Sequence, residues 1–175
     1  MKQLVLGGVR SGKSKLAEQL ATDSGKSVIY IATAKAHDKE MTDRIQKHQN
    51  QRPESWQTVE EEIYLADALQ KHSTADKCIL VDCMTLWLTN LLMHDNPELL
   101  EIELRKLVQA VSEHKEDIVF VSNETGMGIV PLGELTRRYC DEAGLLHQQL
   151  ATHCDRVIIS IAGLPMTLKG KKYEL

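Results

Sequence analysis

The strongest constraint on the fold of this chain lies near its start, where the segment Gly7-Gly8-Val9-Arg10-Ser11-Gly12-Lys13-Ser14 forms a complete G-x-x-x-x-G-K-S pattern. A short apolar run, Gln3–Leu6, precedes this segment, and a run of helix-forming residues from Lys15 to Ala21 follows it. A strand, a glycine-rich loop and a helix in this order form the phosphate-binding loop of P-loop proteins. The chain is therefore expected to fold as an α/β domain that holds a nucleoside triphosphate at this loop.

Each residue type in this loop suits a role in phosphate binding. The glycines let successive backbone N–H groups curl around the β-phosphate, and the helix that follows adds the positive end of its dipole. Lys13 is expected to reach the β- and γ-phosphate oxygens, and the Ser14 hydroxyl is expected to ligate Mg²⁺. The predicted nucleotide-binding residues of this loop are Gly7, Gly8, Val9, Arg10, Ser11, Gly12, Lys13 and Ser14.

The rest of the sequence alternates apolar strand-like runs with amphipathic helical ones. Near-continuous aliphatic runs are typical of strands buried on both faces, which predicts a mostly parallel sheet with helices on both faces. The expected strands are Gln3–Leu6, Ser27–Ala32, Lys77–Asp82, Ile118–Ser122 and Val157–Ile161, with a weaker one around Trp56–Val59 that is antiparallel or at an edge. The expected helices are Lys13–Asp23, Asp38–Gln49, Glu62–Lys71, Thr85–Met93, Pro97–His114 and Glu134–Cys154.

The organisation is that of one domain. The 175 residues contain no internal repeat, low-complexity tract or linker, so residues 1–175 are interpreted as a single P-loop nucleotide-binding domain. The last segment, Gly163–Leu175, has no clear periodicity and is interpreted as a flexible or partner-contacting tail.

Composition excludes several classes of protein. The net charge of −4 argues against a broad nucleic-acid-binding surface. No run reaches the roughly 18 apolar residues that a membrane-spanning helix needs, and the N-terminus lacks a signal-peptide pattern. The four cysteines form no C-x-x-C pair, which favours free thiols in a reducing compartment. A cytoplasmic location is therefore expected.

Two further segments follow expected strands at the edge where α/β proteins bind ligands. Leu80-Val81-Asp82 ends a strand with a carboxylate, which is the Walker B pattern for orienting Mg²⁺ directly or through water. A polar, glycine-containing segment from Ser122 to Pro131 follows a second strand, where it can present side chains and amides to a substrate. A plain strand–helix connection is an equally good interpretation of this second segment.

The expected helix Asp38–Gln49 carries a histidine with two interpretations. Met41, Ile45 and His48 share one helix face, which favours His48 as a packed or partner-bonded side chain. Arg44 lies one turn before it, and a nearby guanidinium favours a neutral, nucleophilic imidazole and can hold phosphates. His147 and His153 lie on a long helix without such a setting, and we interpret them as surface or packing residues.

Several motifs together, in this order along nearly the whole chain, resemble one enzyme family. They are Gly7–Ser14, Tyr30-Ile31-Ala32-Thr33, Arg44-Ile45-Gln46-Lys47-His48, Arg52-Pro53-x-x-Trp56, Asp82-Cys83 with Thr89-Asn90-Leu91-Leu92, and Asn123-Glu124-x-Gly126-Met127-Gly128-Ile129-Val130-Pro131. The sequence resembles the bifunctional adenosylcobinamide kinase/adenosylcobinamide-phosphate guanylyltransferase family of cobalamin nucleotide-loop assembly. The I-Q-x-H, R-P-x-x-W and N-E-x-G-M-G-I-V-P segments carry most of the specificity.

This resemblance implies two reactions at one site. The γ-phosphate of ATP or GTP passes to the aminopropanol hydroxyl of adenosylcobinamide. GTP then guanylylates a histidine, which corresponds to His48, and the GMP passes on to the cobinamide phosphate to give adenosylcobinamide-GDP. Mg²⁺ on Ser14 and Asp82, and a homo-oligomer, in particular a trimer, are also implied.

The resemblance also assigns nucleotide contacts outside the phosphate loop. They map to Ala32, Thr33, Ala34, Gln49, Asn50, Gln51, Arg52 and Glu60, although for Glu60 a surface carboxylate is nearly as good an interpretation. Asn123, Glu124, Gly126 and Met127 are the candidates for contacting the corrinoid substrate. Asp82 stands where relatives carry Glu, and Trp87 is interpreted as a core or subunit-interface residue.

Two alternative functions remain open on the sequence alone. In one, the chain is a P-loop small-molecule kinase without guanylyl transfer, and His48 is structural. In the other, it is a nucleotide-dependent switch or ATPase module that acts on a protein partner. The sequence contains no N-K-x-D guanine motif of the kind found in G proteins.

Overall fold

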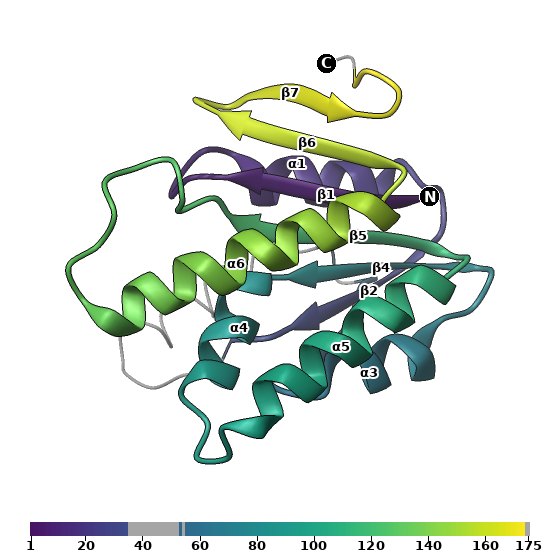
Figure 1. Cartoon of the computed structure of the whole chain (residues 1–175). Coiled ribbons are helices and arrows are strands. Elements are labelled where there is room, and N and C mark those ends of the chain that lie inside the picture. Colours follow the sequence, from purple (N-terminus) through teal and green to yellow (C-terminus); the bar gives the residue numbers. More distant parts are fainter. Residues whose placement is uncertain (35–52, 54, 174–175) are drawn as a thin grey trace.

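The computed structural model describes residues 1–34, 53 and 55–173, and within them strands and helices alternate as expected (Figure 1). Each described helix begins and ends within three residues of its predicted bounds, and the expected helix Asp38–Gln49 lies outside the described residues. In chain order the elements are β1 (Lys2–Gly7), α1 (Lys13–Thr22), β2 (Ser27–Ala32), β3 (Gln57–Glu60), α3 (Leu65–His72), β4 (Lys77–Asp82), α4 (Met84–Leu92), α5 (Glu98–Glu113), β5 (Asp117–Asn123), α6 (Glu134–His153), β6 (Arg156–Ile161) and β7 (Leu164–Lys169).

The strands form one seven-stranded sheet in the order β3-β2-β4-β5-β1-β6-β7. Neighbouring strands are parallel except for β6 and β7, which confirms the prediction of a mostly parallel sheet. The weak strand around Trp56–Val59 is found as β3 at one edge, where it runs parallel to β2. The phosphate-loop strand β1 lies between β5 and β6, well inside the sheet.

The interpretation of Gly163–Leu175 as a tail is wrong, because its first part forms the antiparallel edge strand β7. A two-residue turn, Ala162-Gly163, joins β6 to β7, and both residues have positive φ angles, 52° and 80°. Such turns match the twist of paired strands, so β7 folds back along β6. Pro165 interrupts the strand pattern in the sequence but is tolerated because β7 is an edge strand.

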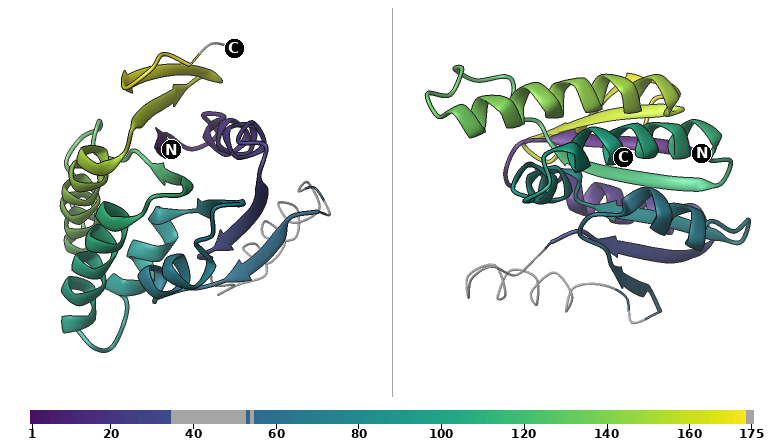
Figure 2. Two further views of the ribbon diagram at one scale, coloured as in Figure 1. Left: turned by 90° about the vertical axis from the view of Figure 1, so that its right-hand side faces the viewer. Right: turned by 60° about the horizontal axis from the view of Figure 1, so that its bottom comes forward.

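The described helices cover both faces of the sheet, with α1 on one face and α3, α4, α5 and α6 on the other (Figures 1 and 2). Alternate residues of each strand serve the two faces. In β1, Leu4 and Leu6 pack into the core beneath α3–α6, whereas Val5 packs beneath α1. Trp87 is fully buried in the first of these cores, and its Nε1 donates to the carbonyl of Ile63 at 2.8 Å. Of its two interpretations, the core position is therefore the one observed.

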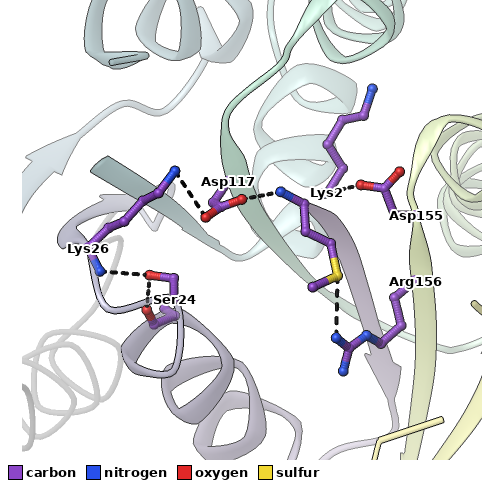
Figure 3. A network of polar contacts seen from close by, with 8 residues as sticks. Lys2, Ser24, Lys26, Asp117, Asp155 and Arg156 are labelled. Carbon is purple, nitrogen blue, oxygen red and sulfur yellow. Dashed lines mark hydrogen bonds and ion pairs between the residues drawn. The ribbon is translucent and has the colours of Figure 1, made fainter. Parts of the chain in front are cut away.

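A network of polar contacts joins the strands at the end of the sheet where most of the parallel strands begin (Figure 3). Asp117 at the start of β5 accepts a contact from the Lys26 ammonium at 3.1 Å and another from the amino group of Met1. The backbone N–H of Lys2 donates to the Asp155 carboxylate at 2.7 Å. These contacts tie together the starts of β1, β2, β5 and β6, so they fix these strands at the end opposite to the phosphate loop.

No helix within residues 1–34 and 55–173 is long and apolar enough to cross a membrane.

Candidate functional site

The phosphate loop connects β1 to α1 as the sequence predicts. Lys13 opens α1, and its Nζ lies 3.2 Å from the carbonyl oxygen of Gly8, so the ammonium group folds back over the loop. A Cβ atom on Gly7 would lie 2.4 Å from Ser11 Oγ and 2.6 Å from the Ser160 carbonyl oxygen. Gly12 has a φ of 92°, which side chains rarely adopt. The loop therefore needs glycine at both positions to keep this shape.

The turn between β6 and β7 supports the loop from the side. The carbonyl of Ser11 accepts a hydrogen bond from Ser160 Oγ at 2.7 Å and another from the N–H of Gly163 at 2.9 Å. A Cβ atom on Gly12 would lie 3.2 Å from Cα of Gly163. Sequence reasoning missed this support because Ser160 is 149 residues away from Ser11, and no local pattern links the two.

The strand register brings most of the predicted site residues to one edge of the sheet. Ala32 is paired with Glu60 on one side and with Asp82 on the other. Gly7 is paired with Asn123 and with Ser160. Since parallel strands lie about 5 Å apart, and β5 lies between β1 and β4, Asp82 emerges roughly 10 Å from the end of β1. This edge faces left in Figure 1.

The carboxylate of Asp82 is oriented by an aromatic pair. Its Oδ2 accepts a hydrogen bond from the Tyr30 hydroxyl at 2.8 Å. The Tyr30 ring is buried and stacks on Trp56, with 6.5 Å between the ring centroids and 29° between the planes. Asp82 itself remains partly exposed at the strand end. It can thus face a ligand while one oxygen is held by the phenol.

The donor set at this edge fits a magnesium ion that arrives with a nucleotide. Ser14 is partly exposed at the start of α1 and supplies a hydroxyl oxygen, and Asp82 supplies a carboxylate. Within the described residues, no three His, Cys, Asp or Glu side chains gather into a metal-binding group. Mg²⁺ is commonly held by one or two protein oxygens, phosphates and water rather than by a protein cage.

Thr33 fastens the end of β2 to the segment after β4. Its side chain is fully buried, and its hydroxyl donates to the carbonyl of Cys83 at 2.7 Å and accepts from the Cys83 N–H at 2.9 Å. Asn90 on α4 donates to the carbonyl of Thr33 at 2.9 Å. The Thr33 hydroxyl is therefore used in positioning the strand ends, and the partly exposed Ala34 follows it. The predicted site residues His48, Gln49, Asn50, Gln51 and Arg52 lie outside the described residues.

The loop after β5 starts against the phosphate loop. The Asn123 N–H donates to Thr85 Oγ1 at 2.8 Å, and the Glu124 N–H donates to the carbonyl of Gly7 at 3.1 Å. The Gly126 N–H then donates to Oε1 of Glu124 at 2.6 Å, which turns the loop around this carboxylate.

Beyond this turn the same loop is apolar and exposed. Met127 is 74% exposed, and Ile129 and Leu132 are 97% and 98% exposed. Large apolar side chains displayed in this way, next to a polar site, are typical of a surface that contacts a ligand.

Sequence reasoning did not identify the contacts of His147, for which it left a surface and a packing role open. The side chain is buried on α6, with Nε2 2.7 Å from Ser122 Oγ and Nδ1 3.6 Å from Oε2 of Glu124. Burial lowers the pKa of His147, although the Glu124 carboxylate opposes this shift in part. The available signal was helical spacing, because His147 shares the buried face of α6 with Ala143, Leu146 and Leu150.

Comparison with known proteins gives a consistent result along the chain. Residues 3–168 match the family model described as cobinamide kinase / cobinamide phosphate guanyltransferase. The chain is 56% identical to the bifunctional adenosylcobalamin biosynthesis protein CobP of Pseudomonas aeruginosa, over 98% of this chain and 99% of that protein. It is 37% identical to the bifunctional adenosylcobalamin biosynthesis protein CobU of Escherichia coli, over 97% of this chain and 100% of that protein.

Solved structures with low sequence identity show the fold. The RadB recombinase superimposes with a TM-score of 0.51 at 18% identity, covering 90% of this chain and 72% of that chain. A Pyrococcus horikoshii protein superimposes with a TM-score of 0.54 at 10% identity, covering 98% of this chain and 87% of that chain. The overall α/β fold of this chain is thus shared with distant proteins.

Proposed function

The chain belongs to the cobinamide kinase / cobinamide phosphate guanyltransferase family, and from this premise we propose that one phosphate-loop site, with His48, carries out both of its reactions. The observation that carries this proposal is the convergence of Lys13, Asp82 and Glu124 at the carboxyl edge of one sheet. The switch-module alternative finds no support in this family, whose description names a kinase and a guanyltransferase.

In the kinase reaction, the phosphate loop holds the triphosphate while the adenosylcobinamide hydroxyl attacks the γ-phosphorus. The backbone N–H groups of residues 8–14 and the start of α1 stabilise the phosphate oxygens. Lys13, folded over the loop, neutralises charge on the leaving diphosphate. These groups act through position and charge, since phosphoryl transfer asks for little covalent chemistry from the protein.

A magnesium ion, held by Ser14 and oriented by Asp82, fits the donor set of this edge. When bound, it would neutralise negative charge on the phosphates. The Tyr30 hydroxyl keeps the Asp82 carboxylate turned to one orientation, which assists this role.

In the guanylyl transfer, the His48 imidazole attacks the α-phosphorus of GTP and pyrophosphate leaves. A phosphate oxygen of adenosylcobinamide phosphate then attacks the GMP phosphorus. The P–N bond breaks and its electron pair returns to the imidazole, so that one transfer becomes two easier ones. Glu60, Ala32, Thr33, Ala34 and residues 49–52 are the further nucleotide-contacting candidates. ATP or GTP serves the first reaction, and GTP the second.

The loop after β5 is the proposed contact for the corrinoid. Asn123, Glu124, Gly126 and Met127 lie next to Gly7 or extend from that point, and exposed apolar side chains follow them. A corrin ring is a large, partly apolar ligand, and such a surface suits it.

We also propose a cytoplasmic homo-oligomer, with the trimer that the family resemblance implies. Apolar side chains on the edge hairpin, Ile161, Leu164, Met166 and Leu168, are each more than half exposed, which supports contact between subunits there. Sedimentation analysis of the purified protein would give the number of subunits directly.

The covalent intermediate is the sharpest test of this proposal. The protein is incubated with GTP labelled at the α-phosphate, denatured, and examined for bound label, beside a sample with GTP labelled at the γ-phosphate. We expect an acid-labile, alkali-stable label from the α-position alone, and none in a His48→Asn variant. Kinase activity should persist in that variant. Label that is undiminished in His48→Asn would contradict the role of His48.

A further inference from the structure

The carboxylate of Glu124 is held on both sides, and one of its partners is a buried histidine. Oε1 accepts the Gly126 N–H at 2.6 Å, and Oε2 faces Nδ1 of His147 at 3.6 Å. The Glu124 side chain is 21% exposed, whereas that of His147 is 9% exposed. The carboxylate is thus open to a ligand on one side and fixed from the interior on the other.

The charge arrangement selects one form of the histidine. Burial lowers the pKa of His147, so the ring is neutral near pH 7 and carries one N–H. A proton on Nδ1 faces the Glu124 carboxylate favourably, whereas a lone pair there would be repelled. Nε2 then accepts the hydroxyl hydrogen of Ser122, whose Oγ is 2.7 Å away and buried. Ser122, His147 and Glu124 therefore form a chain of polar groups that runs from the core to the site.

The position of this chain suits a reaction at the phosphate loop. The Glu124 N–H is bonded to the carbonyl of Gly7, the residue at which the phosphate loop begins. The backbone of Glu124 thus adjoins the loop that holds the triphosphate, and its carboxylate, bonded to the Gly126 N–H, lies at the start of the exposed apolar segment. A hydroxyl acceptor resting on that segment and pointing toward the γ-phosphate would pass this carboxylate.

We propose that Glu124 is the general base of the kinase reaction and that His147 is a positioning residue that holds its carboxylate in place. In this step the acceptor O–H bond breaks and its proton passes to Glu124. The acceptor oxygen forms a bond to the γ-phosphorus, and the bond from that phosphorus to the β-bridging oxygen breaks, with its electron pair leaving on the nucleoside diphosphate. Glu124 afterwards returns the proton to solvent through its exposed side. This role rests on the proposed kinase function and adds to it the residue that accepts the proton.

The titratable groups around this cluster lie on α6 and on the connection between β4 and α4. Burial raises the pKa of Tyr139, on α6, to about 12, and Cys83, Cys140 and Glu124 add to this shift, so the phenol stays protonated near pH 7. Cys83, before α4, has a pKa raised by burial to about 11 and is likewise neutral. The side chain that opposes the effect of burial on the pKa of His147 is Glu124.

The test is a double-mutant cycle on the full chain, with both half-reactions measured separately. Glu124→Gln should lower the kinase kcat by about 10²- to 10⁴-fold, as expected for loss of a general base. Its α-phosphate labelling by GTP should stay within a few-fold of the wild type. His147→Asn should lower the kinase kcat about 10-fold alone and have no further effect in the Glu124→Gln background, because it acts through that carboxylate. His153→Asn, the same change six residues along α6, is the matched control.

The outcomes distinguish failure of the proposed role of Glu124 from failure of the proposed kinase function. Equal kinase rates in Glu124→Gln and wild type would overturn the role of Glu124 while leaving the kinase function intact. A His147→Asn effect that is as large in the Glu124→Gln background would show that His147 has a structural role instead. Ser122→Ala removes the hydroxyl that contacts His147 but keeps the ring, so it should also lower the kinase kcat only when Glu124 is present. If the wild type itself failed to phosphorylate adenosylcobinamide, the kinase function and the base would both be refuted.

Discussion

At the scale of single residues, the polar groups of the site are held by partners that lie far along the chain. Asp82 is held by Tyr30, and Glu124 by His147. The Ser11 carbonyl is held by Ser160 and Gly163. A preorganised site of this kind spends little free energy on reorganisation during the reaction, which is where much of the catalytic advantage of enzymes originates.

The buried histidine should make the stability of the fold depend on pH. The pKa of His147 is lower in the folded chain than the usual value of about 6.5 in an unfolded one, so the unfolded state binds the proton more readily. Stability is therefore fully present above about pH 6.5 and is lost as the pH falls through the folded pKa, with a limiting slope of about 1.4 kcal/mol per pH unit for this group. Denaturant unfolding of wild type between pH 7.5 and 5 measures the slope.

The variant His147→Asn isolates the contribution of this residue. Its unfolding free energy should change less steeply below pH 6.5 than that of the wild type. His72 and His114, whose pKa values burial also lowers, supply a remaining slope in both proteins. Identical slopes in the two proteins would show that His147 protonates as easily in the folded chain as in the unfolded one.

At the scale of elements, the sequence predicts what local patterns encode and misses what distant contacts decide. The aliphatic runs of β1, β2, β4, β5 and β6 and the helical periodicities give these elements to within a few residues. The edge strand β7 was missed because its stability comes from pairing with β6, and because Gly163 and Pro165 are locally typical of a break. For His147 the sequence leaves a surface and a packing role open, since helical spacing predicts that it lies on the buried face of α6 but does not identify its partner on β5.

The hairpin of β6 and β7 should be a rigid part of the domain, and two glycines can test this. Gly170 and Gly25 both have positive φ angles, 84° and 68°. A Cβ atom on Gly170 would lie 2.2 Å from the carbonyl oxygen of Asp155, whereas a Cβ atom on Gly25 would have no such neighbour within 4 Å. Gly25→Ala should therefore cost only the backbone strain, about 1–2 kcal/mol. Gly170→Ala should cost about 1–3 kcal/mol more, because backbone must move.

Thermal and denaturant unfolding of the two variants measure this difference. Equal losses would mean that the end of β7 gives way freely and that the hairpin is only loosely attached. A larger loss in Gly170→Ala would show that this end is packed firmly against the connection between α6 and β6.

At the scale of the whole molecule, the two ends of the parallel strands have different roles. The polar contacts of Asp117, Lys26 and Asp155 fasten the strands where they begin (Figure 3). The phosphate loop, Asp82 and Glu124 emerge where the strands end. The sequence could predict this division because glycine loops and strand-end acids are local patterns. The hydrogen bonds that connect the site residues to partners far along the chain are not local, and only the fold reveals them.

The central claim is that one phosphate-loop site serves both reactions, and Lys13→Ala tests it most directly. Wild type, Lys13→Ala and His48→Asn are assayed side by side for phosphorylation of adenosylcobinamide and for covalent label from GTP marked at the α-phosphate. The account predicts that Lys13→Ala loses both activities by at least about 10²-fold, as expected when the charge on the leaving phosphates is no longer neutralised. His48→Asn should lose only the label. Full labelling of Lys13→Ala beside a lost kinase activity would contradict a shared site and would require a second nucleotide site for the guanylyl transfer.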